Sequence, residues 1–301
     1  MNVGFAGVLP VVPTPFTRDL AVDHASLHAL VDYAVRCGAG AIVYPGVASE
    51  DVQLNDVERC ASMRTVVEAA AGRIAVVGGV NAAEFGDMVA NAKWMAKTGV
   101  AGIMAMAVPT MAAKGYASCY QELAAATGGL PIILQNLVKP RGADLLVEEM
   151  LDIAGAVDAV RYVKEEAVPP GPKVGALVAS GADALDGVIG GGGARFLFEE
   201  LERGVIATMP AMELLELHVA MLRDYGEGRR DAAFELYQAS LPLLLLQASY
   251  RMRLTKLVLK HRGIIATDEV REPLPQLDEV TRRLVLEYFM RLPVNGVKSD
   301  G

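Results

Sequence analysis

Eight short apolar runs alternate with longer amphipathic segments in this 301-residue chain, and that alternation constrains its fold most strongly. The amphipathic segments repeat apolar residues at steps of three and four, which predicts helices, and several of them end on glycine. Each connection is long enough for a helix and too long for a hairpin, so consecutive strands are expected to run parallel. The predicted strands cover residues 7–12, 41–44, 74–77, 102–107, 132–134, 159–164, 185–189 and 205–207.

Eight strand–helix units in succession favour an α/β fold of the (β/α)8 TIM barrel type. An open, doubly wound parallel sheet fits the same periodicity and remains the alternative. After Pro210 the strand pattern stops, and residues 212–228, 229–263 and 277–292 have helical periodicity. We therefore expect a barrel catalytic domain over residues 1–225 and a C-terminal helical extension, or appendage, over residues 226–301.

Composition narrows the classes of function and partner. The net charge of −8 argues against a nucleic-acid partner, because such binding depends on clustered Lys and Arg. The longest uncharged stretch, residues 98–113, is shorter than the roughly 18 apolar residues of a membrane span, so no membrane partner is expected. The chain starts without the basic region of a signal peptide, and its three cysteines are too scattered for a disulfide framework, which predicts a cytoplasmic protein. No histidine has metal-ligand spacing with acids or cysteines, so no metal is expected.

The C-terminal helices contain one apolar run, residues 241–246, that is more hydrophobic than a one-sided surface helix requires. Such a run packs either beneath the barrel or against another subunit. A homo-oligomer, dimer or tetramer, is therefore expected.

The sixth predicted strand ends in a lysine, Lys164. Side chains alternate across a strand, so Lys164 shares one face with Val160 and Tyr162. If that face looks inward, the amine lies at the carboxyl-terminal mouth, where barrel enzymes carry out their chemistry. Apolar surroundings lower the pKa of a lysine, and a neutral amine can form a Schiff base with a ketone. The alternative is a solvated strand-end ion pair with Glu165 or Glu166.

From about residue 7 to residue 292 the chain resembles the dihydrodipicolinate synthase and N-acetylneuraminate lyase superfamily of class I, Schiff-base aldolases and dehydratases. The order and spacing of several segments carry this resemblance: VVPTPF, GVASE at 46–50, YVKEE around Lys164, GVIA at 204–207, KHRGII and REPLPQL. The resemblance implies a barrel with C-terminal helices and a lyase whose Lys164 forms the imine. It also implies a small keto-acid substrate and no cofactor beyond that covalent lysine imine.

One departure from the family pattern points to a branch. Members that condense pyruvate with an aldehyde carry a proton-relaying tyrosine on the fifth strand, where this chain has Gln135, and an amide has no proton to exchange at neutral pH. The pattern is closer to the 2-keto-3-deoxy sugar acid dehydratases, which include L-2-keto-3-deoxyarabonate dehydratase. We therefore predict a dehydratase whose C3 base the sequence does not name. The alternatives are a pyruvate-dependent aldolase, of the 4-hydroxy-tetrahydrodipicolinate synthase or N-acetylneuraminate lyase type, and a non-catalytic keto-acid sensor.

The resemblance also implies roles for individual residues. The predicted catalytic residues are Lys164, Gln135 and Glu50, and the predicted substrate-binding residues are Gly46, Ala48, Ser49, Gly190, Gly191 and Ile206. Gly46, Ala48 and Ser49 belong to the expected carboxylate-binding loop. The glycine run at 190–193 would let backbone approach the sugar-acid chain, or bind a phosphate. Ile206 would contact the keto acid through its backbone while its side chain fills the core.

Structural alternatives stand beside three of these roles. Ser49 also fits a turn or N-cap serine, Glu50 a structural hydrogen-bonding residue, and Gln135 an amide that fills the barrel. Glu165 should point away from Lys164 and be structural.

Overall fold

The computed structural model describes residues 4–181 and 183–293. The fold is a (β/α)8 barrel with C-terminal helices, as predicted: parallel strands alternate with helices along the chain, and a helical region follows the last strand. All eight predicted strands are present, and most of their ends lie within two residues of the predicted ones. The first strand is shorter than predicted because it ends at Val8, just before Pro10. The described residues form two compact units, and each is described by itself.

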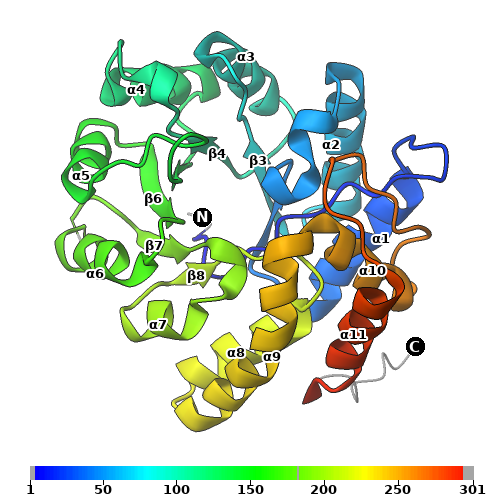
Figure 1. The fold of residues 1–301 in the computed structure, drawn as a ribbon. Helices are drawn as coiled ribbons and strands as arrows, with labels where there is room; N and C mark the ends of the chain where they lie inside the picture. Colours follow the sequence, from blue (N-terminus) through cyan, green and yellow to red (C-terminus); the bar gives the residue numbers. More distant parts are fainter. Residues whose placement is uncertain (1–3, 182, 294–301) are drawn as a thin grey trace. The chain divides into compact units, whose positions relative to one another are not determined.

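The first unit comprises residues 4–9 and 75–209, and its strands have the order β1-β8-β7-β6-β5-β4-β3. In Figure 1, α3 to α7 lie outside the strands that precede them. The strands are β1 (Gly7–Val8), β3 (Ala75–Gly79), β4 (Gly102–Met106), β5 (Ile132–Asn136), β6 (Val160–Glu165), β7 (Gly187–Gly190) and β8 (Ala207–Thr208). The helices are α3 (Phe85–Met95), α4 (Tyr116–Thr127), α5 (Val147–Ala156), α6 (Pro170–Ser180) and α7 (Leu197–Glu202), with short 3-10 turns η3 (Pro109–Met111) and η4 (Gly192–Ala194).

The register of the central strands places Lys164 between two neighbours. It pairs with Gln135 on β5 and with Ile189 on β7. Every residue of β6 is buried except the half-buried Arg161. Neighbouring residues in register point to the same side of a parallel sheet, so Lys164, Gln135 and Ile189 share one face.

The second unit comprises residues 10–74 and 210–293. Its strand β2 (Ala41–Tyr44) matches its prediction, and Val43 forms a parallel bridge with Val11. The helices are α1 (His24–Cys37), α2 (Asp56–Ala70), α8 (Leu215–Gly226), α9 (Arg230–Tyr250), α10 (Met252–His261) and α11 (Glu279–Met290), with 3-10 turns η1 (Val47–Ser49) and η2 (Asp51–Gln53). α1 begins where the Asp23 side chain accepts from the Ser26 amide and ends on Gly38, whose φ of 76° is the left-handed conformation that favours glycine.

The C-terminal helical region differs from its prediction in one break between helices. Residues 229–263 were predicted as one helical segment, but the structure divides them into α9 and α10 because Arg251 has φ 46° and ψ −123°, which a continuous helix cannot contain. The predicted domain boundary between residues 225 and 226 falls at the end of α8, and the division into barrel domain and appendage stays a prediction.

The apolar run in α9 is only partly buried. Leu243 and Leu244 are covered, whereas Leu245 is 70% exposed. The oligomeric state stays a prediction. Among the described helices, none is both long enough and apolar enough to span a membrane.

Candidate active site

Lys164 is the centre of a buried polar cluster in the first unit. It is the penultimate residue of β6, at the carboxyl end of the strand, and only 5% of it is exposed. Its Nζ lies 2.8 Å from Oε1 of Glu166. The ion pair that the sequence allowed is therefore present, but in the interior and not in solvent, since the two side chains are only 6% and 17% exposed.

A chain of amide side chains holds the Glu166 carboxylate in place. Gln135 donates from Nε2 to Oε1 of Glu166 at 2.6 Å, so this oxygen receives both the amide and the ammonium. Oε1 of Gln135 in turn accepts from Nδ2 of Asn81 at 3.3 Å, and Oδ1 of Asn81 accepts from the Met106 amide at 2.8 Å. Gln135 thus lies in register with Lys164 and orients the Glu166 carboxylate, while its predicted contact with substrate stays a prediction.

Two opposing effects act on the pKa of Glu166. Burial would raise it, but the positive charge of Lys164 and hydrogen bonds from Lys164, Gln135 and the Gly192 amide hold the pKa below its ordinary value. Glu166 is therefore a carboxylate at neutral pH. It can accept a proton from the lysine or from a molecule bound to it.

The glycine run after β7 leaves room for two carboxylate side chains. A Cβ on Gly190 would lie 2.2 Å from Oε2 of Glu200, and a Cβ on Gly191 would lie 2.2 Å from Cγ of Glu166. Gly192 has a φ of 60°, in the region that favours glycine. The run was predicted to allow close approach to a substrate; in the structure it accommodates Glu166 and Glu200.

Glu165, which lies between Lys164 and Glu166 in the sequence, has other hydrogen-bond partners. Glu165 accepts from Nδ2 of Asn136 at 2.8 Å and from the Ala167 amide at 2.6 Å, and it is completely buried. Burial raises the pKa of Glu165. Its predicted structural role agrees with these contacts.

The predicted carboxylate-binding loop lies in the second unit, where η1 forms a tight turn. The buried Ser49 hydroxyl donates to the Val12 carbonyl at 2.5 Å and accepts from the Gly46 amide at 2.9 Å. Ala48 packs against an apolar cluster that includes Met252 and Val270. These contacts favour the turn role for Ser49, while substrate binding by this loop stays a prediction.

Glu50, predicted as a catalytic residue, holds the C-terminal segment of the second unit. Its Oε1 accepts from Nζ of Lys256 at 2.5 Å, and its Oε2 accepts from the amides of Arg271 and Glu272 at 2.8 and 2.7 Å. The side chains of Glu50 and Lys256 are both fully buried, and Nζ lies 4.2 Å from the centre of the Phe16 ring. The contacts favour the structural alternative for Glu50.

Ile206 immediately precedes Ala207, the β8 residue that is in register with Ile189 and through it with Lys164. Its amide donates to the Val188 carbonyl and its carbonyl accepts from the Gly7 amide, so both backbone groups belong to the sheet. The prediction that its side chain fills the core is wrong, because Ile206 is 37% exposed and precedes the first residue of β8. Its side chain packs over Gly187, which has no Cβ to oppose it.

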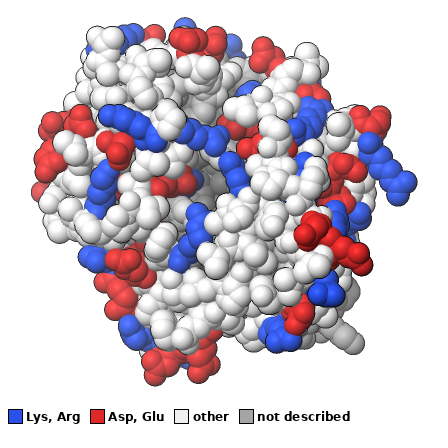
Figure 2. All heavy atoms as spheres, viewed as in Figure 1, with Lys and Arg blue, Asp and Glu red and all other residues white. Residues whose placement is uncertain are grey.

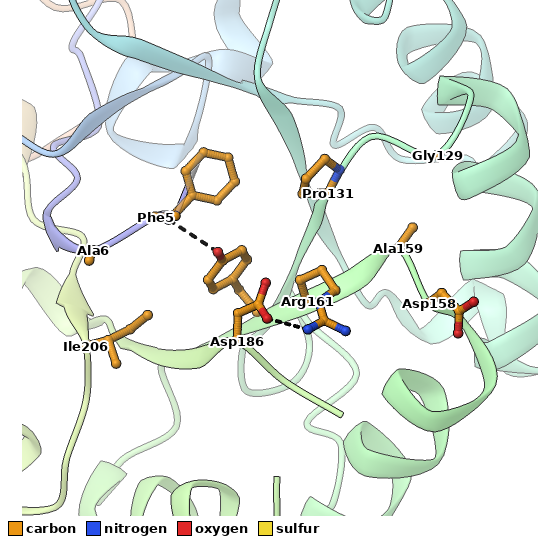
Figure 3. Close-up of a pocket in the computed structure, with 11 residues that line it drawn as sticks. Phe5, Ala6, Gly129, Pro131, Asp158, Ala159, Arg161, Asp186 and Ile206 are labelled. Carbon is orange, nitrogen blue, oxygen red and sulfur yellow. Dashed lines mark hydrogen bonds and ion pairs between the residues drawn. The ribbon is translucent and has the colours of Figure 1, made fainter. Parts of the chain in front are cut away.

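Ile206 lines a cavity of about 500 Å³ at the amino ends of the strands (Figure 3). The charged groups in this cavity include the ion pair of Arg161 with Asp186, and the Tyr162 hydroxyl accepts from the Phe5 amide at 3.3 Å. This cavity is separate from the cluster around Lys164, which lies toward the carboxyl end of β6.

From the sequence, Glu166 was considered only as a partner in a solvated ion pair, and Asn81 was not linked to the cluster. Glu166 could have been found, because the same alternation that sends Glu165 away from Lys164 returns Glu166 to its side. Asn81 lies two residues beyond the end of β3, and no local sequence signal linked it to Gln135.

Within the described part of the chain, the acidic, histidine and cysteine side chains form no group of three suited to a metal ion. On the face shown in Figure 2, basic and acidic side chains are interspersed. The absence of a nucleic-acid partner stays a prediction from the net charge.

Comparison with known proteins places these features in context. Residues 4–169 match the model of the Dihydrodipicolinate synthetase family. The chain is 28% identical to L-2-keto-3-deoxyarabonate dehydratase of Azospirillum brasilense over 95% of its own length and 94% of that protein. It is 35% identical to 4-hydroxy-tetrahydrodipicolinate synthase of Alkalilimnicola ehrlichii over 51% of its own length and 54% of that protein. The crystal structure of dihydrodipicolinate synthase from Rhodopseudomonas palustris superimposes with a TM-score of 0.87 at 25% identity, covering 97% of this chain and 99% of that one.

Proposed function

Because this chain belongs to the dihydrodipicolinate synthetase family and is a lyase, we propose that it dehydrates a 2-keto-3-deoxy sugar acid through an imine on Lys164. One observation carries the proposal: a buried amine, Nζ of Lys164, lies 2.8 Å from the partly buried carboxylate of Glu166, which can accept and return protons. Similarity to the Azospirillum dehydratase over nearly the whole chain supports the choice of substrate class.

The first step is formation of the imine. Glu166 takes a proton from the Lys164 ammonium, and the neutral amine attacks the C2 ketone. Glu166 returns this proton to the C2 oxygen and then carries a second proton from the adduct nitrogen to the same oxygen, which leaves as water. The product is a protonated imine, and Glu166 is again a carboxylate.

The second step is loss of water from the substrate. The protonated imine withdraws electrons from C3, so Glu166 can remove a C3 proton and form an enamine. The enamine expels the C4 hydroxyl, which takes up the proton from Glu166 and leaves as water. Hydrolysis of the imine returns the amine of Lys164 and releases an unsaturated keto acid.

Glu166 supplies the proton relay that Gln135 cannot provide. Gln135 holds Oε1 of Glu166 and would hydrogen-bond a substrate hydroxyl when that contact opens. The lysine imine is the only electron sink that this reaction needs, so the proposal includes no external cofactor. A cytoplasmic location and a homo-oligomeric state belong to the proposal as well.

Retro-aldol cleavage to pyruvate and an aldehyde is the second candidate. It uses the same imine, with Glu166 removing the proton of the C4 hydroxyl so that the C3–C4 bond breaks. The synthase from Alkalilimnicola, 35% identical over half of the chain, supports it. The sensor alternative is less well supported, because a buried Lys164–Glu166 pair is suited to turnover.

Product analysis on a panel of 2-keto-3-deoxy acids tests the proposal. Dehydration gives an unsaturated keto acid, or its tautomer, and no pyruvate. Release of pyruvate and an aldehyde would identify the aldolase instead. No turnover of any panel member, together with binding of a keto acid, would identify the sensor.

A further inference from the structure

Glu200 is a buried carboxyl group that the proposed mechanism does not use. It lies on α7, is 1% exposed, and has its Oε2 against the α-carbon of Gly190. The same carboxyl accepts a hydrogen bond from the Gly191 amide. Its Oε2 is buried without a hydrogen-bond partner among the described residues. A carboxylate oxygen in that position would be strongly disfavoured, whereas a protonated acid carries no charge there.

The surroundings of Glu200 connect it to the lysine site through the glycine run. The Gly191 amide is held by Glu200, and the next amide, that of Gly192, is a hydrogen-bond donor to Glu166. Gly191 also lies against Cγ of Glu166. Movement of this short backbone segment would therefore move Glu166 relative to Nζ of Lys164.

Charges near Glu200 oppose its ionisation. Burial and the negative charges of Glu166 and Glu199 raise its pKa to about 8, while the hydrogen bond from the Gly191 amide and the positive charge of Lys164 act in the other direction. A further buried group without a described partner, Oγ1 of Thr208, belongs to the residue in register with Gly190.

From this geometry we propose that Glu200 is a positioning residue for the Lys164–Glu166 pair, holding the glycine run at 190–192 in place as an uncharged acid. This inference rests on the proposed function, since it assigns to Glu166 the proton transfer of the dehydration. When Glu200 ionises, its negative charge repels the Glu166 carboxylate and displaces it from Nζ of Lys164. The neutral form of Glu200 is therefore the active form.

The test compares Glu200→Gln with Glu200→Ala. Glutamine has the shape of the neutral acid and still accepts from the Gly191 amide, so kcat at pH 7 should stay within threefold of the unmodified protein. Alanine removes that contact, so kcat should fall at least tenfold with little change in KM. Between pH 7 and pH 9 the unmodified protein should lose more of its kcat than Glu200→Gln, by a factor of three or more.

Three outcomes would overturn the assignment. They are full activity of Glu200→Ala, a loss in Glu200→Gln as large as that in Glu200→Ala, and the same alkaline profile for Glu200→Gln and the unmodified protein. Melting temperatures of all forms establish that they are folded.

Thermal melting across pH 5 to 9 keeps the test separate from the proposed function, because it needs no substrate. A carboxyl whose pKa is higher in the folded than in the unfolded protein loses stability as pH rises between those two values. The unmodified protein should therefore lose melting temperature relative to Glu200→Gln from pH 5 to pH 8. If the difference in melting temperature between the two proteins does not change with pH, Glu200 is not a neutral acid in the folded protein. This result would hold even if no substrate were turned over.

Discussion

Nζ of Lys164 and Oε1 of Glu166 lie 2.8 Å apart in the protein interior, although Glu165 stands between these residues in the sequence. The alternation of side chains at the end of β6 brings the amine and the carboxylate together and turns the intervening carboxyl toward Asn136. The amine of the proposed nucleophile thus lies next to a group that can accept its proton.

Replacing Glu166 by glutamine should lower kcat by a factor of about 10² to 10³, because the side chain keeps its size but loses its capacity to accept a proton. The Lys164 adduct should still form, more slowly. Steady-state kinetics and the rate of adduct formation measure the two effects.

Glu165→Gln is the matched control for that substitution. The neighbouring carboxyl contacts Asn136 and the Ala167 amide and not the lysine, so this change should alter kcat less than threefold. Equal losses in the two variants would remove Glu166 from the proton relay.

Gln135→Leu should move the acidic limb of the kcat profile to higher pH. The Gln135 hydrogen bond lowers the pKa of Glu166, so its loss raises that pKa, and the base becomes protonated at a pH where it was ionised before. Gln135→Glu should move the limb further, since it places a second negative charge beside Glu166. A pH–rate profile that is unchanged in both variants would contradict this assignment.

Lys256→Met should lower the free energy of unfolding by about 3 kcal/mol or more, because it leaves the Glu50 carboxylate buried without its counter-ion. The double variant Glu50→Gln, Lys256→Met should regain part of that loss. Denaturant unfolding measures each value.

The exposed pair of Lys114 with Glu122 provides the comparison, and Lys114→Met should cost less than about 1 kcal/mol. Similar costs at the two lysines would show that the buried pair does not hold the second unit together.

His218 should make the protein less stable in acid. Burial lowers its pKa to about 4, and neither ring nitrogen has a hydrogen-bond partner among the described residues. The unfolded chain binds a proton at this histidine near pH 6.5, but the folded chain does so only near pH 4, so stability falls as pH drops through that interval. His218→Leu should flatten this part of the stability profile.

His28→Asn serves as the control for His218, because the His28 side chain is 54% exposed beside Asp32. The free energy of unfolding of this variant should fall with decreasing pH as it does in the unmodified protein. If His218→Leu loses as much stability between pH 6.5 and pH 4 as the unmodified protein, other groups cause that loss.

The fold was predictable because each strand–helix unit of the barrel has the same local sequence pattern. That pattern is a short apolar strand followed by a segment of helical periodicity, which in several units ends on glycine. The strand ends were harder to predict, since Leu9, Leu185 and Val205 look apolar whether or not they pair in the sheet. Lys164 and Gln135 could be assigned to one site because counting the predicted strands puts them on the sixth and the fifth, which are neighbours in a barrel. Glu200 could not, since a carboxyl from α7 reaches the site only through three-dimensional packing.

Borohydride reduction in the presence of a 2-keto-3-deoxy acid, followed by peptide mapping, tests the central claim most directly. The buried amine of Lys256, whose pKa burial lowers to about 8, is the internal comparison. The account predicts one covalent adduct, on Lys164, and none in Lys164→Arg. An adduct on Lys256 alone, or turnover without any adduct, would contradict it.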